Sequence, residues 1–208
     1  MQVVVGAFLG ALIGLVSDRL SARWPLHADG SVRGLDWRTI VVTLAAGASF
    51  AAVIGQWPDA RDQVVLGVYV AALMVLLATD LDQRLLPDLV TLPLIGYSLV
   101  VLVTGLNPLL EGKDLALVSA IGAAIGAPAL LLVTDRLFGG ALGMGDVKLA
   151  VSLGAMCGVS RLVTGFLVAS VVFAVVLLVL IALRRISLRQ AIPFGPVLIA
   201  AGVIATVV

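Results

Sequence analysis

Three aspartates lie close together in a charged stretch between two long apolar segments. Residues 80–88 read Asp-Leu-Asp-Gln-Arg-Leu-Leu-Pro-Asp, which places carboxylates at Asp80, Asp82 and Asp88. No charged residue occurs in residues 64–79 or 89–110 on either side. Charges at the end of a membrane segment are costly to bury, and those that persist usually serve a function. We therefore expect chemistry at this stretch.

A second charged stretch, Gly143-Met-Gly145-Asp146-Val-Lys148, follows a glycine-rich approach that also includes Gly139 and Gly140. Glycine allows the close backbone approach that other residues prevent, so an extended substrate could pair with this backbone. The alternative interpretation is a helix cap in which Asp146 pairs with Lys148. We predict that Asp80 and Asp146 meet in space and act together.

The remaining residues of the first stretch suggest positioning roles. Proline suits the first turn of a helix, so the chain should leave one helix near Asp82 and enter the next near Pro87 or Asp88. Asp88 is then an early-turn carboxylate that the helix dipole favours. Asp82 and Asp80 should point to different faces of a helix, with one facing the site and the other facing water or Arg84. The sequence does not decide which one faces the site.

The composition is that of a membrane protein. The chain has 208 residues, of which 62% are hydrophobic and 12% charged, with a mean hydropathy of +1.21. Soluble domains are about half apolar and about a quarter charged. We predict an all-α, polytopic membrane protein in which residues 1–208 form a single transmembrane domain without a separate soluble domain.

The net charge and the single cysteine exclude other classes of site. A net charge of +1 gives no indication of a nucleic-acid partner. Cys157 is the only cysteine and His27 the only histidine, so no multi-cysteine zinc site can form within the chain. We expect Cys157 to be a packing residue and predict neither a metal nor a cofactor.

A spanning helix needs about 20 mostly apolar residues, and about 17 is the lower limit. This rule predicts about eight transmembrane helices, of which the sixth is the shortest. The predicted spans are Gln2–Ser17, Thr39–Trp57, Gln63–Thr79, Leu89–Leu109, Leu115–Val133, Val147–Gly158, Leu162–Leu183 and Pro193–Val208. The first span lacks the basic start and the cleavage site of a signal peptide, so we expect it to be retained.

The basic residues predict the orientation of these spans. With the N-terminus outside, ten lysines and arginines fall in inside loops and three in outside loops. The inside residues are Arg19, Arg23, Arg33, Arg38, Arg84, Arg136, Lys148, Arg184, Arg185 and Arg189, and the outside residues are Arg61, Lys113 and Arg161. Positive charge favours the cytoplasmic side, so both aspartate stretches should face the cytoplasm.

Taken together, the two stretches resemble those of a known family. The first motif is Asp80-x6-Pro87-Asp88, and the second is Gly-Met-Gly-Asp146-Val-Lys148, in which Asp146 follows Asp80 by 66 positions. This pair of motifs resembles that of the bacterial prepilin peptidases, or type IV leader peptidases. These are membrane aspartyl peptidases of the Gly-x-Gly-Asp class. The sequence Ile192-Pro-Phe-Gly-Pro196 resembles the family's motif before its last helix. The resemblance implies that Asp80 and Asp146 form the catalytic pair. Residues expected to bind or position the substrate are Asp82, Pro87, Asp88, Gly143, Gly145 and Lys148.

The resemblance also implies the substrate and the location. The substrates would be type IV prepilins or pseudopilins, cleaved after a short basic leader by a multi-pass enzyme of the inner membrane whose site faces the cytoplasm. Two adjacent carboxylates cannot both ionise cheaply, so one is charged and the other protonated. The charged carboxylate would activate a water, and the protonated one would hydrogen-bond the substrate carbonyl.

The first loop departs from the family pattern. Common bacterial members carry a larger loop with two Cys-x-x-Cys pairs that bind zinc, and they methylate the new N-terminus with S-adenosylmethionine. The loop between Asp18 and Arg38 is short and contains no cysteine. We therefore expect a peptidase in which methyltransferase activity is absent or doubtful.

Three alternatives stay open at this point. The chain could be another intramembrane aspartyl protease of the presenilin or signal-peptide-peptidase kind, although those proteases lack the Leu-Pro-Asp stretch. It could be a small transporter that uses Asp80 and Asp146 for proton or cation coupling, although we see neither inverted repeats nor acids at mid-membrane. It could also be a homologue that has lost its activity.

Overall fold

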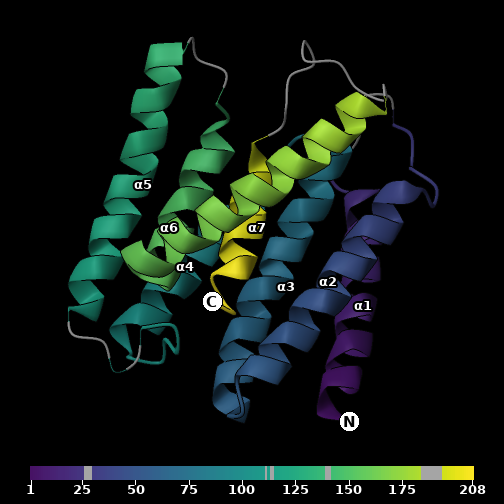
Figure 1. Cartoon of the computed structure of the whole chain (residues 1–208). Helices are drawn as coiled ribbons and strands as arrows, with labels where there is room; N and C mark the ends of the chain where they lie inside the picture. Colours follow the sequence, from purple (N-terminus) through teal and green to yellow (C-terminus); the bar gives the residue numbers. More distant parts are fainter. Residues whose placement is uncertain (26–29, 111, 113–114, 139–141, 184–193) are drawn as a thin grey trace.

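The computed structural model describes residues 1–25, 30–110, 112, 115–138, 142–183 and 194–208. In this part of the chain all regular secondary structure is helical, arranged as a bundle (Figure 1). Its seven helices are α1 (Gln2–Ser21), α2 (Trp37–Gln56), α3 (Ala60–Gln83), α4 (Asp88–Val103), α5 (Ala116–Phe138), α6 (Met144–Ala182) and α7 (Gly195–Ile204). The predicted all-α class is confirmed.

The predicted count of eight spans needs correction. Among the described residues, five helices are long and apolar enough to cross a membrane, namely α1, α2, α3, α5 and α6. The helices α4 and α7 are shorter, with 16 and 10 residues. The predicted sixth and seventh spans, Val147–Gly158 and Leu162–Leu183, correspond to the two parts of one kinked element of 39 residues, α6, which ends at Ala182.

The helix α6 changes direction at a kink (Figure 1). Gly158 has φ +64° there, a conformation that side chains disfavour. The backbone groups beside the kink find partners in neighbouring segments: the Val159 N–H donates to Ser119 Oγ at 2.9 Å, and Asn107 Nδ2 donates to the Met156 carbonyl at 2.9 Å. Such partners are required where no water is present. The predicted break between residues 158 and 162 therefore falls at this kink, which separates two helical parts of α6.

The helix α3 supplies much of the core. Its side chains Leu66, Tyr69, Leu73 and Met74 are at most 1% exposed. By contrast, α1, α5 and the second part of α6 expose many large apolar side chains, as helices that face lipid do. Because α3 is packed from several sides, its end is a well-supported position for a functional group.

The helix ends bring the two charged stretches to the same end of the bundle. The ends of α1 and α3 and the beginnings of α2, α4, α6 and α7 all lie at the upper end in Figure 1. Residues 84–87 connect α3, which ends just after Asp80 and Asp82, to α4, and Asp146 lies in the first turn of α6. The bundle therefore provides one shared location for a joint site, as the proposed chemistry requires.

The length of α3 generates a test of topology. Its 24 residues extend about 36 Å at about 1.5 Å per residue, which is enough to cross a bilayer. In a Cys157→Ala background, Arg61→Cys and Arg84→Cys should react with an impermeant maleimide from opposite sides, with Arg84→Cys labelled from the cytoplasm. If both positions are labelled from the same side, α3 does not cross the membrane.

Candidate active site

Asp80 lies in the last turn of α3 and is 6% exposed. The helix ends at Gln83, where Arg84 adopts a left-handed conformation and its N–H donates to the Asp80 carbonyl at 2.9 Å. Within the described part of the chain, the Oδ2 atom of Asp80 is buried without a hydrogen-bond partner. Burying a carboxylate oxygen unpaired is costly, which marks this position as a candidate for function.

Asp146 comes from the first turn of α6. Its N–H donates to the Gly143 carbonyl at 3.0 Å, and a helix N-terminus favours a negative charge at this place. The charge of Asp146 acts on the carboxyl group of Asp80. The structure thus brings together the two aspartates that the sequence singled out, while their catalytic role stays a prediction.

The beginning of α7 packs directly on Asp80. A Cβ atom at Gly195 would lie 2.7 Å from Asp80 Oδ2 and 2.8 Å from its Cγ, so no larger residue fits without a shift. Sequence reasoning noted the motif at 192–196 but assigned Gly195 no role. The only signal was a glycine between Phe194 and Pro196. Ile192 and Pro193 of this motif, like Gly139 and Gly140, lie outside the described residues.

The Gly-x-Gly-Asp turn packs against the first stretch. A Cβ atom at Gly145 would lie 2.7 Å from the Cβ of Leu86, between α3 and α4. A Cβ at Gly143 would have more room, with Asp146 Oδ2 as its nearest neighbour at 3.3 Å. The glycine at 145 therefore allows the beginning of α6 to approach the connection between α3 and α4.

An ion pair joins the same two stretches. Lys148 Nζ donates to Asp88 Oδ1 at 2.6 Å, so Lys148 pairs with Asp88 and not, as the alternative cap interpretation assumed, with Asp146. Asp88 is the first residue of α4 and Pro87 directly precedes it. The predicted break between helices is confirmed, because α3 ends at Gln83 and α4 begins at Asp88.

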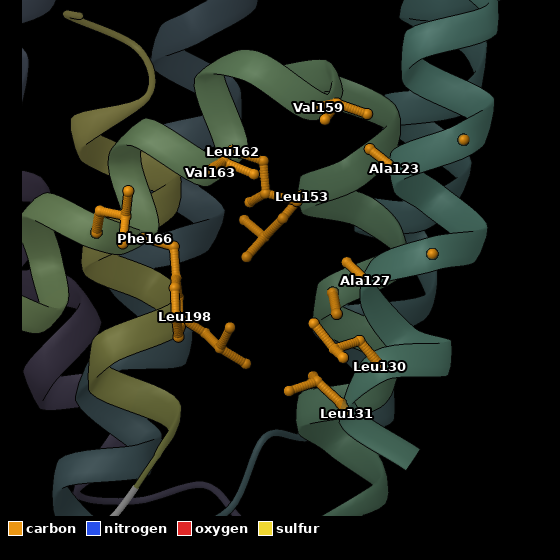
Figure 2. Close-up of a pocket in the computed structure, with 14 residues that line it drawn as sticks. Ala123, Ala127, Leu130, Leu131, Leu153, Val159, Leu162, Val163, Phe166 and Leu198 are labelled. Carbon is orange, nitrogen blue, oxygen red and sulfur yellow. The ribbon is translucent and has the colours of Figure 1, made fainter. Parts of the chain in front are cut away.

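An apolar cavity of about 430 Å³ lies beside the first part of α6 (Figure 2). Its walls come from α5, both parts of α6 and α7. Ala150 and Leu198 line it, about one helical turn beyond Asp146 and Gly195 respectively. Because its lining is apolar, the cavity suits hydrocarbon groups and offers nothing to a charged one.

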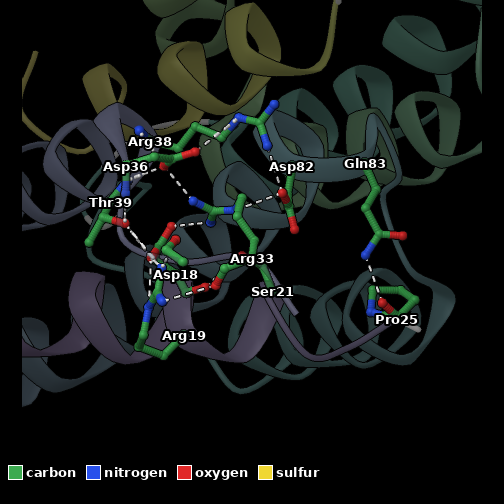
Figure 3. A network of polar contacts seen from close by, with 11 residues as sticks. Asp18, Arg19, Ser21, Pro25, Arg33, Asp36, Arg38, Thr39, Asp82 and Gln83 are labelled. Atoms are coloured by element: carbon green, nitrogen blue, oxygen red, sulfur yellow. Dashed lines mark hydrogen bonds and ion pairs between the residues drawn. The ribbon is translucent and has the colours of Figure 1, made fainter. Parts of the chain in front are cut away.

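Asp82 faces away from this site. Its side chain is 1% exposed and lies 2.8 Å from both Arg33 Nε and Arg38 NH1 (Figure 3). The sequence had suggested water or Arg84 as its surroundings. The structure instead pairs it with the first loop and the beginning of α2, while Asp80 faces α6 and α7.

The fold and the site define a class: a polytopic, all-helical membrane protein with two interacting carboxylates at one end of the bundle. Residues 67–179, more than half of the chain, match the model of the type IV leader peptidase family. The chain belongs to this family. The matched segment contains both Asp80 and Asp146 but not Gly195.

Curated relatives agree with this assignment. The chain is 33% identical to a prepilin leader peptidase/N-methyltransferase of Dickeya chrysanthemi, over 81% of this chain and 59% of the relative. Proteins of the same name from Aeromonas hydrophila and Pseudomonas putida are each 34% identical, over 89% and 90% of this chain and 58% and 59% of theirs. The chain thus spans somewhat over half the length of these relatives. No solved structure matches it.

The packing of Gly145 can be tested by thermal unfolding in detergent. We expect Gly145→Ala to lower stability by about 1–3 kcal/mol, because overpacking forces neighbours to shift. Gly126→Ala is the matched control, since a Cβ there meets nothing within 4 Å. Its melting temperature should equal or slightly exceed that of the parent. A Gly145→Ala protein as stable as the parent would contradict the close contact with Leu86.

Proposed function

We propose that this protein is a membrane aspartyl endopeptidase that removes the basic leader from type IV prepilins or pseudopilins. One observation supports this most directly: in a member of the type IV leader peptidase family, the carboxylate of Asp80 is buried with one unpartnered oxygen and interacts with Asp146. We further propose that the chain works as one transmembrane peptidase domain.

In the proposed reaction, the two carboxyl groups share one proton. The ionised one accepts a proton from a water molecule, whose oxygen attacks the carbonyl carbon of the peptide bond. The protonated one donates a hydrogen bond to the carbonyl oxygen as the tetrahedral intermediate forms. When the C–N bond breaks, the leaving amine takes a proton from the pair, which is thereby restored.

Other residues of the two stretches would position the substrate. The backbone near Gly143 and Gly145 could pair with an extended segment around the scissile bond. Pro87 begins α4, and the ion pair of Asp88 with Lys148 joins that helix to α6. We propose that these contacts hold the two halves of the site at a fixed separation.

The substrate class and the location rest on charge and hydropathy. The curated relatives are called prepilin leader peptidases, which supports a prepilin-type substrate. The site lies at one end of an apolar bundle, where a basic leader could stay in water while an apolar segment enters the membrane. The excess of arginine in the predicted inside loops supports a cytoplasmic site in the inner membrane.

Substitutions of the aspartates test the proposed pair. Asp80→Asn and Asp146→Asn should each abolish cleavage of a prepilin by the purified protein, because an amide can neither accept nor cycle the proton. Both variants should insert and purify like the parent, since removing a buried charge does not oppose folding. Cleavage by the parent should follow a bell-shaped pH profile that reports the pair as a unit.

Asp82→Asn and Asp88→Asn serve as comparisons and should retain measurable activity, because neither carboxylate is assigned to the reacting atoms. If Asp82→Asn is inactive while Asp80→Asn cleaves normally, the first acid is Asp82. If Asp146→Asn also cleaves normally, the peptidase proposal fails and ion coupling becomes the better explanation.

Methylation is tested separately from cleavage. The relatives' names include N-methyltransferase, yet residues 18–38 contain no cysteine. We expect the mature pilin to appear without added mass when S-adenosylmethionine is supplied, and chelators to leave cleavage unchanged. The Aeromonas hydrophila relative, assayed in parallel, is the positive control. A product heavier by one methyl group would contradict this expectation.

A further inference from the structure

A partly buried network of charged side chains joins the end of α1, the first loop, the beginning of α2 and the end of α3 (Figure 3). Its formal charges cancel, because three aspartates meet three arginines. The members are Asp18, Asp36, Asp82, Arg19, Arg33 and Arg38. None of these side chains contributes to the carboxylate pair itself.

Arg33 is the centre of the network. Its guanidinium donates to Asp18 Oδ1 and Asp36 Oδ1, and its Nε lies 2.8 Å from Asp82 Oδ1. Burial alone would lower the pKa of Arg33, but the hydrogen bond and charge of Asp18 and the charges of Asp82 and Asp36 raise it above its ordinary value. Arg33 therefore stays charged and binds three carboxylates at once.

The network determines how the last turn of α3 is rotated. Asp82 lies two residues after Asp80, which is about 200° around a helix, so fixing one side chain fixes the direction of the other. The helix ends one residue later, at Gln83, where few backbone hydrogen bonds hold it. Gln83 Nε2 adds a second tie by donating to the Pro25 carbonyl at 2.7 Å.

Asp80 needs such external support. Among the described residues its Oδ2 has no hydrogen-bond partner that could hold it in place. From α7 it meets Gly195, which brings no charge. The charged groups that act on it are Asp146 of α6 and Arg84 just beyond α3. None of these contacts is a direct hydrogen bond to that oxygen.

We propose that Asp82 and Arg33, assisted by Arg38, are positioning residues that orient the Asp80 carboxylate toward Asp146. The first loop, by way of Arg33, thereby becomes part of the machinery of the site. This inference rests on the proposed peptidase function and adds residues to it that act through the helix end, without touching the substrate.

We would measure kcat/KM for prepilin cleavage as a function of pH, with the full chain in detergent. The pH at which this profile rises and falls does not depend on how much protein folds, so it separates positioning from stability. Arg33→Gln leaves one excess negative charge, which opposes ionisation of the nearby pair. The acidic limb of its pH profile, where cleavage rises as the pair ionises, should move to higher pH by about half a unit. Asp82→Asn leaves one excess positive charge, and its limb should move to lower pH.

Two further variants separate charge from position. In the double variant Arg33→Gln/Asp82→Asn the charges balance again, so the limb should return to the parent's position. Arg33→Lys keeps the charge but cannot bridge three carboxylates, so its limb should stay in place. Its kcat should still fall about tenfold or more, because small misplacements of reacting groups are costly. If Arg33→Gln is not recovered from membranes, Arg38→Lys tests the other arginine that pairs with Asp82.

Asp62→Asn is the matched control. Asp62 is a buried acid on the same helix that pairs with Arg61 at 3.1 Å, but it lies in the first turn of α3. Its profile should equal the parent's. Network variants with the parent's profile and kcat, and only a lower yield of protein, would overturn the proposal. Normal cleavage by both Asp80→Asn and Asp146→Asn would instead refute the proposed aspartyl peptidase, so the two failures are distinguishable.

Discussion

Asp80 lies at the end of an apolar helix with one carboxylate oxygen buried and unpartnered in the described structure, and the surrounding elements are arranged around that oxygen. The helix α7 begins with glycine because a Cβ atom would collide with the carboxylate. The helix α6 begins with a second carboxylate whose charge acts on it. Such a group is costly to bury, so the bundle must hold it through contacts made elsewhere.

Those contacts are distributed over three connections at one end of the bundle. The first loop binds Asp82 through Arg33, the connection from α3 to α4 packs Leu86 on Gly145, and Lys148 reaches back to Asp88. Each contact fixes a helix end and leaves Asp80 Oδ2 without a hydrogen-bond partner in the described structure. A site that must bind a water and a peptide carbonyl needs this arrangement, because groups that hydrogen-bonded the carboxylate directly would compete with the substrate.

Much of this site could be predicted from the sequence because its signals are local. A charged stretch between apolar segments identified the pair Asp80 and Asp82, and the position of Pro87 gave the break between α3 and α4. A break after Gly158 was predicted, but the backbone partners at this kink, Ser119 and Asn107, could not be, because they come from other segments. The pairing of Asp82 with Arg33, and the contact of Gly195 with Asp80, likewise depend on side chains far apart in the chain.

Hydropathy explains why the charged stretches stand out in the sequence while the partners of their side chains do not. Hydropathy reports how costly it is to place a residue in lipid, and this cost is large for an unpaired carboxylate and small for a glycine. A charge leaves a clear trace but says nothing of its partner. For that reason Asp82 and Asp80 look equivalent in the sequence, and only the arginines of the first loop distinguish them.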